Sequence, residues 1–212
     1  MTEGVLFVLS EPAVGQEVLF DDWYDTEHAP ARARLPGIRT ARRYRATDRR
    51  EPGWLALYDL DLEVLESDRY RSLRACRSDR EKAVMAALPI LDRRTYELLG
   101  KHGHDTGRPA PLLVATSLTV RAEDEPELDD WYEQEHIPLL TAIPGWNRIR
   151  RYRKASGRGP AFLALHELSG PGVFDTDGYR TATTTSWRSR IHRRVIERER
   201  RTFALHKDFS QR

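Results

Sequence analysis

Hydrophobic and polar positions along the chain predict the same six elements twice. Each half begins with a short apolar run typical of a strand, followed by a segment with the apolar spacing of a helix. The order in each half is strand, helix, strand, strand, helix, strand. In the first half the expected strands are 5–9, 38–46, 53–60 and 93–99, and the helices are 17–30 and 67–87. In the second half the strands are 112–120, 146–154, 161–168 and 200–206, and the helices are 126–140 and 177–196.

The residues themselves also recur. FDDWYDTEHAP at 20–30 returns as LDDWYEQEHIP at 128–138, and 12 of the 24 residues from 22 to 45 are identical at an offset of 108. The chain is therefore a tandem duplication. We expect one unit at 1–101, a linker rich in glycine, proline and polar residues at 102–111, and a second unit at 112–212.

The predicted element order is that of a ferredoxin-like unit. Its antiparallel sheet carries helices on one face, and the other face needs cover. A second copy in the same chain can supply that cover. The expected fold is therefore α+β, with two tandem ferredoxin-like units whose sheets pack into a barrel within one chain.

The repeated helix carries an acid and an imidazole side by side. A helical wheel places Glu27 near the centre of the apolar stripe and His28 at its edge, and Glu135 and His136 repeat this arrangement. A carboxylate in an apolar stripe needs an ion-pair partner, a hydrogen bond or a proton. The proline two residues after each histidine predicts that the helix ends or kinks there, where free carbonyl groups favour a protonated imidazole. A purely structural role for the pair stays open.

The strand after each helix offers partners for this pair. Strand alternation puts Arg42 and Tyr44 on one face and, in the second copy, Arg150 and Tyr152. Tyrosine beside arginine suits the stabilisation of an enolate or phenolate oxygen, because both donate hydrogen bonds to negative charge. An ion pair that only holds the helix on the sheet is an equally open explanation.

Charge and composition exclude several classes of function. The 35 basic and 33 acidic residues give a net charge of +2, which offers nucleic acid no overall attraction. No apolar stretch is long enough to cross a membrane, and the sequence has no nucleotide-binding motif. The N-terminus lacks the basic leader of a secretion signal, and Cys76 is the single cysteine. We expect a cytoplasmic protein with no nucleic-acid or membrane partner.

The string D-W-Y-x-x-E-H-x-P followed by P-G resembles the dimeric α+β barrel superfamily, and within it the EthD-like branch, over nearly the whole chain. The resemblance implies units that pair as a homodimer, so that this fused chain is expected to be a monomeric pseudo-dimer or a homodimer. It also implies cofactor-free lyases, dehydratases, cyclases, isomerases and oxygenases acting on aromatic or polyketide-like molecules. Some relatives bind haem. The ligand cavity in this superfamily lies between sheet and helices, beside the helix histidine.

These observations lead to one leading hypothesis with alternatives. We expect an enzyme of secondary or catabolic metabolism that binds a hydrophobic small molecule, with no bound cofactor and no metal, haem being a weaker alternative. The two alternative hypotheses are a cofactor-free monooxygenase and a non-catalytic binding protein. The expected catalytic residues are His28 or His136 as base, Glu27 or Glu135 to orient it, and Tyr44 or Tyr152 at the oxyanion. The expected substrate-binding residues are Arg42, Arg150, Trp23, Trp131, Tyr24, Tyr132, Trp54 and Phe162.

The two copies differ inside the expected cavity. Tyr58 in the first copy corresponds to His166 in the second, and Trp54 corresponds to Phe162. We therefore expect two cavities of unequal shape, without knowing from the sequence which one carries the chemistry.

Overall fold

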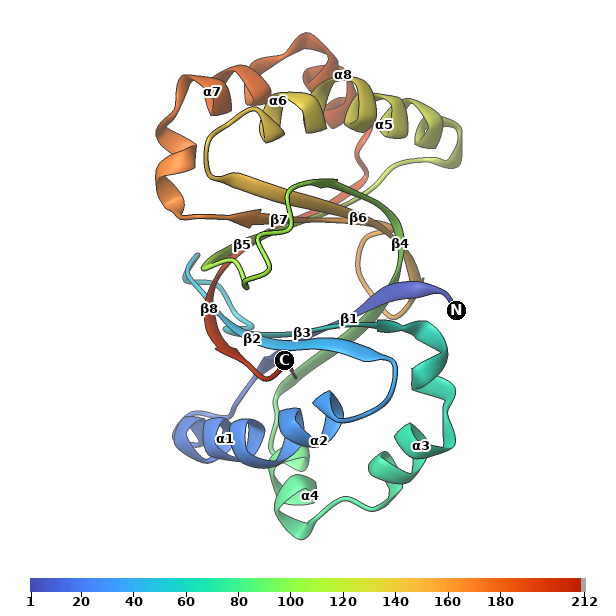
Figure 1. The fold of residues 1–212 in the computed structure, drawn as a ribbon, viewed down its shortest axis with the longest axis vertical. Coiled ribbons are helices and arrows are strands. Elements are labelled where there is room, and N and C mark those ends of the chain that lie inside the picture. The colour runs from blue at the N-terminus through green and yellow to red at the C-terminus, as the bar shows by residue number, and fades with distance from the viewer. Residues whose placement is uncertain (211–212) are drawn as a thin grey trace. The chain divides into compact units, whose positions relative to one another are not determined.

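A computed structural model describes residues 1–210. The chain folds into two compact units. Unit one comprises Met1–Leu98, Ala155–Arg158 and the residues from Leu205 onward, and unit two comprises Leu99–Lys154 and Gly159–Ala204. Figure 1 shows the helices and strands of each unit.

Unit one has four helices on one face of an antiparallel sheet (Figure 1). Its strands are β1 (Glu3–Glu11), β2 (Ile38–Ala46), β3 (Trp54–Asp61) and β4 (Ile90–Gly103), hydrogen-bonded in the order β4-β1-β3-β2. Its helices are α1 (Glu17–Trp23), α2 (Ala29–Ala33), α3 (Asp68–Ala75) and α4 (Asp79–Ala86), with a π-helical turn η1 (Tyr24–His28) and a 3₁₀ turn η2 (Leu62–Glu66).

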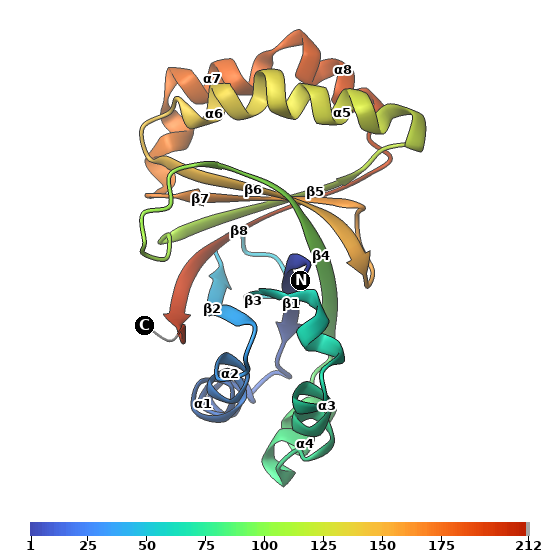
Figure 2. The ribbon, with the colours of Figure 1, turned by 45° about the vertical axis from the view of Figure 1, so that its right-hand side comes forward.

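Unit two repeats this arrangement, and Figure 2 shows its helices as a layer over its sheet. Its strands are β5 (Leu112–Thr119), β6 (Trp146–Ser156), β7 (Phe162–Leu168) and β8 (Glu197–Asp208), in the order β8-β5-β7-β6. Its helices are α5 (Glu125–Trp131), α6 (Ile137–Thr141), α7 (Asp177–Thr184) and α8 (Ser186–Arg194). The turns are η3 (Ala122–Asp124), η4 (Tyr132–His136, π-helical) and η5 (Pro171–Asp175). The eight strands have the order of a closed barrel, which confirms the expected fold class.

Each long charged helix expected from the sequence is instead a pair of short helices. The break falls at Ser78 in unit one and at Thr185 in unit two, where the backbone is extended. Each hydroxyl accepts a hydrogen bond from the backbone N–H three residues later and so caps the second helix. Ser and Thr favour caps over helix interiors because their side chains compete for backbone hydrogen bonds.

The sequence predicted that the first helix of each unit ends or kinks at its proline, but neither helix ends there. The helix continues to Ala33 in unit one, because a π-helical turn precedes Pro30. In this turn the N–H of Ala29 bonds to the carbonyl of Tyr24, five residues back instead of four. The wider turn accommodates a proline, which has no backbone N–H to donate. It also rotates the residues after Tyr24 to other positions around the helix axis than an α-helical wheel predicts.

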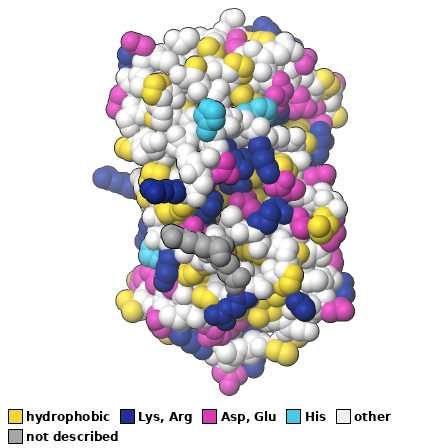
Figure 3. All heavy atoms as spheres, viewed as in Figure 1, with side chains coloured by type: hydrophobic (Ala, Val, Ile, Leu, Met, Phe, Trp, Pro, Cys, Tyr) yellow, Lys and Arg dark blue, Asp and Glu magenta, His cyan; other side chains and the backbone are white. Residues whose placement is uncertain are grey.

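Each unit buries its own core between helices and sheet. In unit one, Phe20 and Trp23 of α1 pack against β1 and β3. In unit two, Leu128 and Trp131 of α5 pack against the equivalent strands, β5 and β7. Such burial stabilises by about 1.5–3 kcal/mol for each large apolar side chain. Basic and acidic side chains are interspersed over the visible surface (Figure 3), in keeping with the near-zero net charge. Among residues 1–210, no helix combines the length and the apolar character needed to span a bilayer.

Candidate functional site

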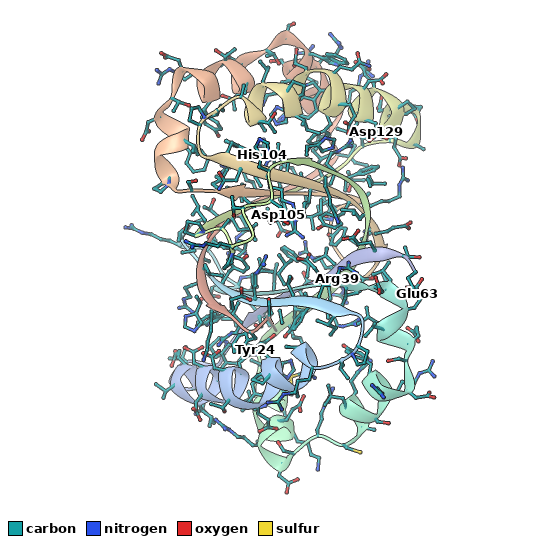
Figure 4. The ribbon with its side chains drawn as sticks, viewed as in Figure 1. Tyr24, Arg39, Glu63, His104, Asp105 and Asp129 are labelled. Carbon is teal, nitrogen blue, oxygen red and sulfur yellow. The ribbon has the colours of Figure 1, made fainter. Side chains whose placement is uncertain are left out.

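Unit one encloses a cavity of about 120 Å³ between its sheet and its helices. Most of its lining is apolar and comes from β1, α4 and Trp23. The polar groups that reach it from the π-helical turn and the sheet include Tyr24, His28 and Tyr58. Four arginines also line it: Arg32, Arg74, Arg77 and Arg93. Figure 4 labels Tyr24, which lies between its helix and the sheet. An apolar cavity with a few convergent polar groups is the usual form of a small-molecule site.

His28 is held by a buried carboxylate. Its Nδ1 lies 3.2 Å from Oε1 of Glu81, and the guanidinium of Arg32 lies 3.1 Å from the same oxygen. The three side chains are 12%, 6% and 7% exposed, respectively. Arg77 lies 3.8 Å from the same oxygen. A charge removed this far from water needs such a partner, since an unpaired buried charge costs several kcal/mol.

The imidazole of His28 is neutral at pH 7. Burial lowers its pKa to about 4, although the carboxylate of Glu81 acts in the opposite direction. Burial also disfavours the charged form of Glu81, but the hydrogen bond from His28 and the charge of Arg32 hold its pKa below the usual value. His28 therefore donates its Nδ1–H to the ionised Glu81, which leaves the lone pair on Nε2. The protonated imidazole expected from a helix end is wrong, because the helix continues past it and burial dominates.

Within residues 1–210, no hydrogen bond or ion pair joins the side chain of Glu27 to His28 or that of Glu135 to His136. Ser78 donates a hydrogen bond to Glu27, and Thr185 donates one to Glu135 over 2.6 Å. Glu135 also accepts from Trp131 Nε1 at 3.0 Å. Each glutamate thus holds the capping residue of the last helix in its unit. The π-helical turn explains the difference from the wheel, because it changes the direction of the residues that follow it.

Glu81 was not singled out from the sequence. It is the fourth residue of S-D-R-E (78–81), which has the spacing of a capping box. Ser78 accepts the backbone N–H of Glu81 at 2.9 Å, as that motif predicts at the start of a helix. The motif would have placed Glu81 in a first helical turn, but not beside a histidine 53 residues away.

Two tyrosine hydroxyls meet in the cavity of unit one. The hydroxyls of Tyr24 and Tyr58 lie 3.2 Å apart. Burial raises the pKa of Tyr24 and raises that of Tyr58 well above its usual value, so both keep their protons. One hydroxyl can donate to the other, which leaves one O–H to donate to a ligand.

The strand residues expected at the oxyanion lie elsewhere. Neither Arg42 and Tyr44 nor Arg150 and Tyr152 line the cavity of their unit. On β2 the helices cover the face that carries Arg43, whose guanidinium pairs with aspartates of α1 and η1. Because both faces of β2 carry arginine, the sequence could not decide which face the helices cover.

Of the six aromatic residues expected to bind the substrate, four line the cavities. They are Trp23 and Tyr24 in unit one and Trp131 and Tyr132 in unit two. Trp54 does not line the cavity but lies 4.0 Å beneath the guanidinium of Arg43. Phe162 lies 4.8 Å beneath that of Arg153.

The cavity of unit two is smaller, at about 50 Å³, and contains histidines in place of the His-Glu pair. His136 stacks on Trp131 with ring centroids 4.2 Å apart, and His166 takes the position of Tyr58. Burial, as the main cause, lowers the pKa of both histidines to about 3. Within residues 1–210, no group of three or more His, Cys, Asp or Glu residues is placed to hold a metal ion.

No family model matches the sequence, and no curated protein matches it. Solved structures match over nearly the whole chain. An anthrone oxidase-like protein superimposes with a TM-score of 0.66 and 14% identity, covering 98% of this chain and 92% of that one. The chain has the fold of a tandem dimeric α+β barrel. A protein from Lactobacillus acidophilus, provisionally described as a monooxygenase, gives a TM-score of 0.63 at 9% identity, covering 100% and 97%. A protein provisionally described as a chlorite dismutase gives 0.61 at 17%, covering 98% and 96%.

Membership of this barrel fold does not carry an activity, because these identities show the fold alone. The EthD-like branch stays a prediction. The cavities of this dimeric α+β barrel do not fit a haem, which some relatives were expected to bind. A tryptophan ring lies 4.4 Å from the imidazole of His28 and 4.2 Å from that of His136. With about 120 and 50 Å³ beside them, neither histidine has room for a porphyrin.

Proposed function

We propose that the protein is a cofactor-independent enzyme of small-molecule metabolism whose active site is the cavity of unit one. The observation that carries this proposal is the neutral His28, held by the buried Glu81, at the wall of an apolar cavity. A neutral, oriented imidazole is the usual general base of enzymes that remove a proton from carbon.

The first step follows from this geometry. Nε2 of His28 removes a proton from a carbon next to a carbonyl group of the substrate, and the electron pair of the C–H bond moves onto the carbonyl oxygen. A hydroxyl of the Tyr24–Tyr58 pair donates a hydrogen bond to this oxyanion. The new imidazolium lies between the carboxylate of Glu81 and the anionic substrate, and both stabilise it.

Two outcomes are compatible with this step. Return of the proton to another atom gives isomerisation, and loss of a leaving group from the neighbouring carbon gives elimination. Attack of the carbanion on a second carbonyl carbon of the same molecule gives cyclisation, with the proton on His28 passing to the new alkoxide. Reaction of the carbanion with O₂ instead gives an oxygenase. The second candidate is favoured by the neighbours described as anthrone oxidase-like and, provisionally, as a monooxygenase. Oxidation of anthrone balances as anthrone plus O₂ giving anthraquinone plus water.

Hydrogen–deuterium exchange tests the shared step without the true substrate. Anthrone, 2-tetralone and acetylacetone are C–H acids of three sizes, and their binding can be followed by quenching of tryptophan fluorescence, since Trp23 lines the cavity. Under argon in D₂O, we expect the protein to accelerate deuterium uptake by at least one bound probe, measured by mass spectrometry. His28→Ala should return the rate to the protein-free value, and the matched variant His136→Ala should not.

The same experiment in air separates the candidates. Exchange with no oxygen consumption supports a lyase, cyclase or isomerase, and oxygen consumption with anthraquinone formation supports the oxygenase. A protein that binds the probes but accelerates neither exchange nor oxidation would be a non-catalytic binding protein, and the proposal would be wrong. It would also be wrong if His136→Ala, and not His28→Ala, removed the exchange.

A further inference from the structure

The two units carry opposite charges at the same position of their last helix. Ser78 caps α4 and accepts the backbone N–H of Glu81 at 2.9 Å. Thr185 caps α8 and accepts the backbone N–H of Arg188 at 3.1 Å. Glu81 and Arg188 are therefore equivalent residues, and both belong to the helix that packs beside the cavity histidine. Unit two therefore has a cation, Arg188, at the position where unit one has the carboxylate that pairs with His28.

The arginines beside the two cavities differ in their partners. Arginines line both cavities, and within residues 1–210 neither lining includes Asp or Glu. In unit one Glu81 lies 3.1 Å from Arg32 and 3.8 Å from Arg77. In unit two Arg188 donates to the carbonyl of Thr183 at 2.9 Å, and Arg198 contacts the neutral His192 at 3.4 Å. These two contacts orient the guanidinium groups of Arg188 and Arg198 without neutralising their charge.

One nitrogen of each of two buried histidines in this cavity, the Nδ1 atom, has no hydrogen-bond partner among residues 1–210. Nδ1 of His136 and Nδ1 of His166 are both inaccessible to water, and neither has a hydrogen-bond partner in the part of the chain that the structure describes. Burial and neighbouring charges, including that of Arg188, keep the pKa of His136 low. Burial and the charges of Arg198 and Arg200 also lower the pKa of Arg188, which shows how concentrated the positive charge is.

We propose that the cavity of unit two binds a small organic carboxylate. In unit one the protein's own carboxylate, Glu81, accepts hydrogen bonds from the histidine and from Arg32. In unit two, where Arg188 stands in place of this acid, a ligand carboxylate accepts hydrogen bonds from Arg188 and Arg198, because guanidinium groups match the geometry of a carboxylate. Its small apolar body packs against Trp131 and Trp146, which form the aromatic wall.

This site is separate from the proposed catalysis in unit one. It lies in the other unit, uses none of the residues assigned to proton removal, and is tested by binding alone. If the deuterium-exchange experiment fails, the carboxylate site in unit two is not affected. If no carboxylate binds in unit two, the proposed catalysis in unit one is not affected.

Calorimetric titration with four probes tests the proposal. Propionate carries the charge and a short apolar body, formate the charge alone, sulfate an inorganic charge, and 1-propanol the body without charge; all are small enough for a cavity of about 50 Å³. We expect propionate to bind one site per chain more tightly than formate or sulfate, with no binding of 1-propanol at the same concentrations. Arg188→Gln and Arg198→Gln should each weaken propionate binding by about tenfold or more, because each variant loses one charge-assisted hydrogen bond.

The matched control is Arg193→Gln, on the exposed side of the same helix and outside the cavity, which should bind like the unchanged protein. Circular dichroism checks that each variant is folded, and the two cavity variants provide independent tests. Equal binding of 1-propanol and propionate would overturn the proposal. It would also be overturned by sulfate binding as tightly as propionate, by propionate binding that is unchanged in both cavity variants, or by no propionate binding at all.

Discussion

Substitution of Glu81 by Gln should destabilise the protein strongly, because it leaves Arg32 buried without a counter-charge. The side chain of Arg32 is 7% exposed, and its guanidinium pairs with the carboxylate of Glu81 at 3.1 Å. Removal of one partner from a buried pair costs about 3–5 kcal/mol. The amide oxygen of Gln still accepts one hydrogen bond, so we expect the lower end, about 3 kcal/mol in the free energy of unfolding.

Urea unfolding followed by tryptophan fluorescence measures this change. The matched control is Asp79→Asn on the same helix, whose fully exposed carboxylate pairs with Lys82. An exposed pair of this kind contributes little, so the control should stay within about 0.5 kcal/mol of the unchanged protein.

A second substitution separates a buried charge from simple loss of packing. Unit two has Leu140 where unit one has Arg32, at the repeat offset of 108. In Glu81→Gln, the further change Arg32→Leu removes the unpaired charge and should restore more than half of the lost stability. The reasoning is refuted if Glu81→Gln costs less than about 1 kcal/mol, or if the double variant is less stable than the single one.

Three further predictions concern pH and helix caps. In the folded protein the pKa of His166 is about 3, below the usual 6.5. As pH falls, the unfolded chain therefore takes up this proton before the folded protein does. The folded state is fully stable with respect to this group above pH 6.5 and loses stability as pH falls from 6.5 towards 3. Urea unfolding at pH 4.5 should show a loss of roughly 2–3 kcal/mol from this group, and His166→Gln should remove that share. For proton removal by His28, the exchange rate per protein should rise with pH through about 4 and stay level to pH 7; a rise centred near 6.5 would contradict the buried imidazole. Ser78→Ala and Thr185→Ala should each cost about 1 kcal/mol in urea unfolding through loss of a helix cap, and no change in either would contradict the capping geometry.

Most of the architecture was accessible from the sequence. The duplication and the apolar periodicity predicted the strands of both units, because alternation and repeat offset depend only on local residue order. The helix termini were less accessible. Ser78 and Thr185 interrupt helices that the charge pattern suggested were continuous, and the signal for each break is a single capping residue.

The candidate site was only partly predictable. His28, Trp23 and Tyr24 were expected in the cavity and line it. Glu81 was missed, since its position beside His28 depends on the packing of two helices that are far apart in sequence. Glu27 was assigned to the histidine because a wheel of 100° per residue does not anticipate a π-helical turn.

Fusion of the two copies lets their sites evolve apart. In a homodimer one gene encodes both subunits, so any substitution at a histidine-side position changes both cavities at once. Here Glu81 and Arg188 are encoded separately, and one unit has an acidic residue at this position while the other has a basic one. A single polypeptide can in this way keep two ligand preferences on one inherited scaffold, which a symmetric assembly of identical chains cannot.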